Sequence, residues 1–105
     1  HELAEGDAPF LTEVFETFMR ETSERITAMR RAVDAKDVDH LKRTAHTLKG
    51  AGSHLGAERM AHICKRLESI GNAEFVTVAT ALIEELVEEF NRVKVALSDQ
   101  LLSEQ

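Results

Sequence analysis

Apolar residues recur every three or four positions through most of the chain, which is the spacing of amphipathic helices. The first such segment extends to about Ala35, and Pro9 suits its first turn with Asp7 as the capping residue. The polar stretch Arg20–Arg25 interrupts the spacing, so we expect a bend or break there. The segment is therefore predicted to form a short first helix and a second, longer one. Its apolar positions are Phe10, Val14, Phe18, Ile26, Met29 and Val33.

Three more helices are predicted downstream. Asp37 is a good N-cap for a helix that ends at Gly56, and a further helix covers about 57–70 before the stop signal Gly71–Asn72. The last helix covers about 73–98, and we expect the residues after it to fray.

The connections between these helices are short, and no segment shows the alternation of a strand. Short connections make consecutive helices antiparallel neighbours. We therefore expect an all-α fold, an antiparallel four-helix bundle with an additional short N-terminal helix. The whole chain, 1–105, is expected to be a single domain with an ordered core of about 8–98.

Composition excludes several classes of function. The formal net charge of −6 argues against binding nucleic acid or an anionic membrane. No apolar run approaches the roughly 20 residues that span a bilayer. The single Cys64 fits a reducing compartment, so we expect a cytoplasmic domain. The chain starts with His1 rather than Met, so we expect it to be a fragment of a larger protein. We interpret His1 as a tag or cloning remnant.

The predicted helix after Asp37 carries the candidate chemistry. At 100° per residue, His46 falls about 130° from the centre of the apolar stripe, so it should face solvent. Lys49 and Gly50 follow one turn later on the same side, and helical side chains lean back toward the N-terminus. The lysine can therefore bring its ammonium to an anion on the imidazole, and the glycine leaves the ring open to another protein.

A neutral imidazole nitrogen is a nucleophile near neutral pH, and a phosphoryl group on it would be stabilised by a nearby cation. The chain contains no Gly-rich phosphate-binding loop. We therefore expect no autonomous catalytic activity, and the phosphoryl group must come from another protein.

The segment from Ala45 to Ala57, AHTLKGAGSHLGA, resembles the signature A-H-x-L-K-G-x-x-x-x-L-G of histidine phosphotransfer (HPt) domains. The stretch Cys64–Glu68 is similar to the family's next helix, and the resemblance extends from about Phe10 to Leu97. It implies a phosphorelay intermediate that accepts a phosphoryl group from the aspartate of one receiver domain and passes it to another. Because the chain does not start with Met, we expect it to be part of a hybrid sensor kinase.

The resemblance also implies roles for individual residues. His46 would be the phospho-acceptor, Lys49 the phosphate-stabilising cation and Gly50 the residue that keeps the ring accessible. Glu68 matches a position where several members have a glutamine that holds the other ring nitrogen, and Ser53 is a second supporting candidate. The residues expected to dock the acidic receiver are Lys42, Arg43, Lys65 and Arg66. The domain itself would be monomeric and bind no cofactor, while Mg²⁺ would belong to the receiver.

Other interpretations remain open. The bundle could mediate protein association without phosphotransfer, or it could bind a metal through His40, His54 or His62, although no set of four ligands is evident. These histidines and the acidic face of the last helix are expected to be solvated. Cys64 is expected to be a small core residue. The phospho-acceptor domain of chemotaxis kinases is a related family that fits the residues around His46 less well.

Overall fold

The structure, a computed structural model, describes the backbone of residues 2–103 and the side chains of residues 9–102. Four helices account for almost all of this part of the chain, and it contains no strand. They are α1 (Glu2–Asp34), α2 (Val38–His54), α3 (Glu58–Glu68) and α4 (Phe75–Ser103). The expected all-α class is confirmed. His1 lies outside the described residues.

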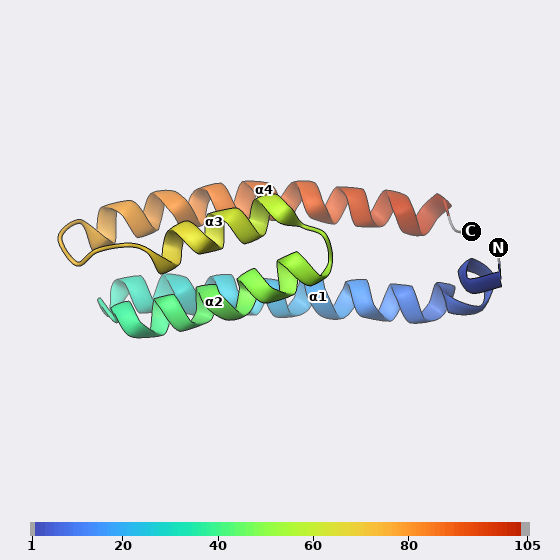
Figure 1. The fold of residues 1–105 in the computed structure, drawn as a ribbon, viewed down its shortest axis with the longest axis horizontal. Helices are drawn as coiled ribbons and strands as arrows, with labels where there is room; N and C mark the ends of the chain where they lie inside the picture. Colours follow the sequence, from blue (N-terminus) through green and yellow to red (C-terminus); the bar gives the residue numbers. More distant parts are fainter. Residues whose placement is uncertain (1, 104–105) are drawn as a thin grey trace.

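The helices form an elongated bundle of 52 × 18 × 17 Å (Figure 1). Helices α2 and α3 form an antiparallel hairpin, α2 also packs on α1, α3 packs on α4, and α1 packs on α4. Each helix thus has two neighbours, as in an antiparallel four-helix bundle. The hairpin covers only part of the length of α1 and α4, which extend beyond it together as a two-helix stem (Figure 1).

The break predicted within Arg20–Arg25 is wrong, and so is the additional short N-terminal helix. Helix α1 is continuous from Glu2 to Asp34, with Pro9 inside it. Thr22 is fully buried between the core residues Phe18 and Ile26 at four-residue spacing, so the apolar face continues through this stretch with a threonine in it. The other polar residues of the stretch lie at least partly in solvent, and they interrupt the sequence pattern without interrupting the helix.

Apart from the end of α4, the predicted ends of the other helices agree with the structure to within about two residues. The Asp37 carboxylate accepts a hydrogen bond of 3.0 Å from the backbone N–H of His40, as an N-cap does. Gly56 has a positive φ of 83° in the turn between α2 and α3, a conformation that glycine adopts without steric cost. Helix α4 extends to Ser103, beyond the predicted end at about residue 98.

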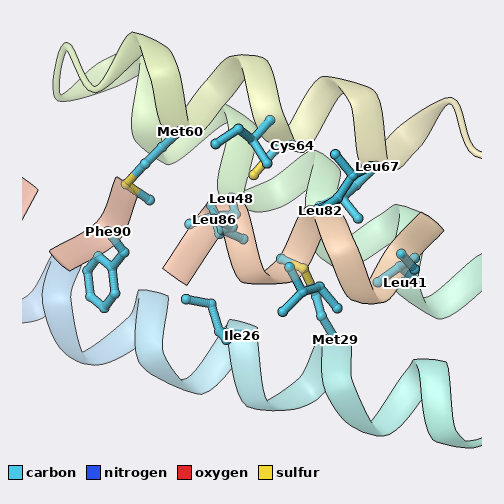
Figure 2. Close-up of a cluster of buried hydrophobic side chains, with 14 of the residues drawn as sticks. Ile26, Met29, Leu41, Leu48, Met60, Cys64, Leu67, Leu82, Leu86 and Phe90 are labelled. Atoms are coloured by element: carbon cyan, nitrogen blue, oxygen red, sulfur yellow. The ribbon is translucent and has the colours of Figure 1, made fainter. Parts of the chain in front are cut away.

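One continuous core fills the bundle, and aliphatic and sulfur-containing side chains from all four helices meet in it (Figure 2). Cys64 is fully buried in this core, as expected. Burial, reinforced by the negative charge of Glu68, raises the pKa of the Cys64 thiol to about 12, so the thiol stays protonated.

Phe10, which the spacing assigned to the apolar face, lies on the stem with 61% of its surface exposed. No helix among the described residues is long and apolar enough to cross a membrane.

Thr22 offers a test of this packing. Its hydroxyl is buried without a hydrogen-bond partner among the described residues. Replacing Thr22 with the similarly shaped valine removes an unsatisfied polar group, so Thr22→Val should raise the free energy of unfolding by about 1 kcal/mol in urea denaturation.

The matched control is Thr27→Val in the same helix. The Thr27 hydroxyl is exposed and donates to the carbonyl oxygen of Ser23 at 3.2 Å, so its removal should change stability little. A loss of stability in Thr22→Val would show that the hydroxyl is satisfied in solution.

Candidate functional site

The hairpin of α2 and α3 creates the site by placing His46 and Lys49 of α2 opposite Glu68 of α3. The helices can approach closely near their turn because Gly52 has no side chain. A Cβ on Gly52 would lie 3.3 Å from the carbonyl oxygen of Ala57. The backbone N–H of Ala57 also donates to the carbonyl oxygen of Gly52, with an N···O distance of 2.7 Å. This glycine therefore fixes how α2 meets α3.

His46 points away from the core, as the helical periodicity predicted, and 69% of its side chain is exposed. Its Nδ1 lies 2.8 Å from Oε2 of Glu68. An ionised carboxylate only accepts hydrogen bonds, so we assign the imidazole proton to Nδ1. Nε2 then carries the free lone pair, and the ring is oriented for attack through that nitrogen.

Lys49 pairs with the other oxygen of the same carboxylate, with 2.5 Å between Nζ and Oε1. This ion pair lowers the pKa of Glu68 most, and the hydrogen bond from His46 lowers it further, against the opposing effect of burial. Glu68 is therefore an anion at neutral pH. Its carboxylate, on a side chain that is only 23% exposed, holds the imidazole and the ammonium together.

The structure places Gly50 on the exposed side of α2, where a Cβ would meet no atom within 4 Å. Packing therefore does not explain why this position is glycine. The surface at Gly50 is open, and the role of this glycine in access to the ring stays a prediction.

The residues expected to dock a partner do not all lie together. Arg43 and Lys65 are exposed and Lys42 is half-buried, on the two helices that carry the site. Arg66 instead reaches toward α4, where its guanidinium lies 3.1 Å from Glu85. Arg66 is therefore engaged on the α3–α4 side of the molecule, and the docking role is less suited to it.

Ser53 is exposed and lines a shallow groove between α2 and α3 with Lys49, His62 and Lys65. Ser53 makes no hydrogen bond with His46 among the described residues, so its supporting role stays a prediction. His40, His54 and His62 are exposed. In the part of the chain that the structure describes, no three His, Cys, Asp or Glu side chains cluster as metal ligands would.

The ion pair of Lys49 with Glu68 was not predicted from the sequence, which gave Lys49 only the role of binding phosphate. The signal was present: an antiparallel hairpin that pairs His46 with Glu68 also brings the next turn of α2, with Lys49, toward the same carboxylate.

Comparison with known proteins gives consistent results. The family model described as Hpt domain matches residues 13–96. The chain is 24% identical over 96 residues to the phosphorelay intermediate protein rdeA of Dictyostelium discoideum, a match that covers 91% of the chain and 38% of that protein. It is 26% identical over 98 residues to histidine-containing phosphotransfer protein 2 of Arabidopsis thaliana, covering 90% and 63%. The chain thus spans less than two thirds of either relative.

The crystal structure of histidine-containing phosphotransfer protein B (HptB) from Pseudomonas aeruginosa PAO1 has a similar fold. The TM-score is 0.82 at 32% sequence identity, and the match covers 97% of this chain and 86% of that one.

The two glycines of α2 should respond in opposite ways to a methyl group. Gly50→Ala gains the helix propensity of alanine, about 1 kcal/mol, because nothing obstructs its Cβ. Gly52→Ala meets the backbone of the α2–α3 turn. We expect Gly52→Ala to be the less stable of the two variants by about 1–2 kcal/mol in urea denaturation. Equal stabilities would contradict the close approach of the helices at Gly52.

Proposed function

The chain belongs to the Hpt domain family, and from this premise we propose that it is a phosphorelay intermediate. In this proposal Nε2 of His46 accepts a phosphoryl group from the aspartate of one receiver domain and passes it to the aspartate of another. The observation that carries the proposal is an exposed imidazole whose Nδ1 is held by Glu68, because this arrangement leaves the lone pair of Nε2 available.

The proposed transfer is an in-line displacement at phosphorus. The lone pair of Nε2 forms the new N–P bond while the bond between phosphorus and the aspartate oxygen breaks, and that oxygen leaves as a carboxylate. The return step reverses these bonds on a second receiver. The described residues of this chain orient the ring of His46 and place a positive charge near the phosphoryl group. We assign Mg²⁺ and its acidic ligands to the receiver.

Lys49 is the proposed cation for the transferred group. In the unphosphorylated structure its ammonium is held by Glu68, one helical turn from His46. A side chain that is 31% exposed can rotate toward a dianion on the ring, and a single cation near a surface contributes about 1–4 kcal/mol to such an interaction.

We propose that receivers dock over the open space at Gly50 and are attracted by Lys42, Arg43 and Lys65. An acidic receiver pocket complements these side chains, and such complementarity increases the rate of encounter. Cytoplasmic location and action as a monomer belong to the same proposal, and the buried single Cys64 suits a reducing compartment.

Substitution of the acceptor tests the proposal directly. His46→Gln should abolish labelling of the domain by a radiolabelled phosphorylated receiver, because the amide has no nucleophilic ring nitrogen. Helical content by circular dichroism should be unchanged, since His46 is exposed and lies outside the core. Label on the unaltered domain should be acid-labile and base-stable, as phosphohistidine is.

His54→Gln is the matched control, since His54 is an exposed histidine on the same helix. It should label as the unaltered chain does. Labelling that survives in His46→Gln would contradict the proposal, and an unaltered domain that never takes label would favour a bundle that only mediates protein association.

A further inference from the structure

Glu68, the residue that accepts the hydrogen bond from Nδ1 of His46, carries a full negative charge. Glu68 is an anion because Lys49 and His46 lower its pKa, and its two oxygens are divided between those two partners. A neutral amide could also accept a hydrogen bond from Nδ1, but its N–H groups could donate to that nitrogen instead, so the carboxylate is the more selective partner for the unphosphorylated ring. The charge matters further in a state of the ring that can itself become positively charged.

The phosphorylated ring is such a state. Once Nε2 is bonded to phosphorus, the ring can hold a proton only at Nδ1, and the protonated ring is positively charged. A protonated ring leaves phosphorus as neutral imidazole, whereas an unprotonated ring must leave as an imidazolate anion, which is a much poorer leaving group. The proton on Nδ1 therefore controls how readily the phosphoryl group is transferred from His46 to the next receiver.

A carboxylate stabilises this protonated ring more than an amide does, because a hydrogen bond between two charged groups is roughly twice as strong as one between neutral groups. The distance of 2.8 Å between Nδ1 and Oε2 in the free domain is short enough for such a bond to form when the ring becomes charged. In the free domain Lys49 also pairs with this carboxylate, and the hydrogen bond from Nδ1 remains as its partner when the ammonium turns toward a phosphoryl group on the ring.

We propose that Glu68 is a positioning residue that keeps the proton on Nδ1 of phosphorylated His46. This inference rests on the proposed function. In the onward step the N–P bond breaks and its electron pair remains on Nε2. A receiver aspartate oxygen bonds to phosphorus, and the ring departs as neutral imidazole with its Nδ1 proton. Glu68 thereby favours donation to the next receiver.

The other charged groups around the ring act differently. On α2, Lys49 carries the opposite charge and pairs with Glu68, while Lys42 and Arg43 are cations one helical turn before His46. On α3, Lys65 is positive, and the buried Cys64 thiol stays neutral. On α1, the charged residues that line the neighbouring groove with Arg43 and Thr47 are Glu21, Glu24 and Arg25. Glu68 is the carboxylate in contact with Nδ1.

The test is the pH profile of the onward step. The unaltered domain and Glu68→Gln are labelled on His46 from a phosphorylated receiver, separated, and mixed with fresh unphosphorylated receiver from about pH 6 to about pH 9. We expect the two transfer rates to be similar at the acid end. Both transfer rates should fall at alkaline pH, and the fall should begin about one pH unit lower in Glu68→Gln. At alkaline pH, Glu68→Gln should therefore transfer the phosphoryl group roughly tenfold more slowly than the unaltered domain.

Three further measurements make the result decisive. Glu68→Asp keeps the negative charge and should restore much of the pH profile of the unaltered domain. Glu85→Gln removes an equal charge from α4 and should leave the profile of the unaltered domain unchanged. If Glu68→Gln takes too little label from the receiver, phosphoramidate is used to label it, and the protonation of Nδ1 is read from ¹⁵N chemical shifts across the same pH range.

Superimposable profiles, or equal protonation of Nδ1 in both phosphorylated proteins, would overturn the inference while leaving the phosphorelay proposal intact. The proposed function fails separately, if the unaltered domain takes no label from the receiver.

Discussion

One carboxylate connects the two helices of the hairpin to the chemistry of the site. Glu68 accepts from Nδ1 of His46 with one oxygen and from Lys49 with the other, so a single residue of α3 positions both informative side chains of α2. The arrangement requires close and reproducible packing of the hairpin. Gly52 allows the approach at the turn, and buried residues such as Leu48 and Cys64 fix it from within (Figure 2). The exposed imidazole is therefore held at Nδ1 by a side chain of the packed hairpin, while Nε2 stays free.

Much of this could be predicted from the sequence because helical periodicity determines which side chains face outward. The exposure of His46, the N-cap at Asp37 and the burial of Cys64 follow from local spacing and capping rules. The break expected within Arg20–Arg25 was wrong for a physical reason. A buried threonine within an otherwise polar stretch gives no apolar signal, yet Thr22 faces the core and the helix continues through it.

Contacts between helices were harder to predict, since they depend on the register of the hairpin. The sequence indicated Glu68 as the partner of His46 through a family resemblance, but spacing along one helix says nothing about a residue on the next. The ion pair of Lys49 with Glu68 and the pairing of Arg66 with Glu85 on α4 both required the three-dimensional arrangement. Lys65 and Arg66 carry the same charge on the short helix α3, but their surroundings differ. Lys65 lines the groove between α2 and α3, whereas Arg66 pairs with Glu85 of α4.

The central claim is that Glu68 fixes the proton of the free imidazole on Nδ1 and leaves Nε2 as the nucleophile. The most direct measurement is a long-range ¹H–¹⁵N correlation spectrum of the unphosphorylated domain with His46 assigned. A protonated Nδ1 and an unprotonated Nε2 at mildly alkaline pH are the predicted result. A spectrum in which Nε2 carries the proton would contradict the account, since the nitrogen that faces away from Glu68 would then have no lone pair to offer.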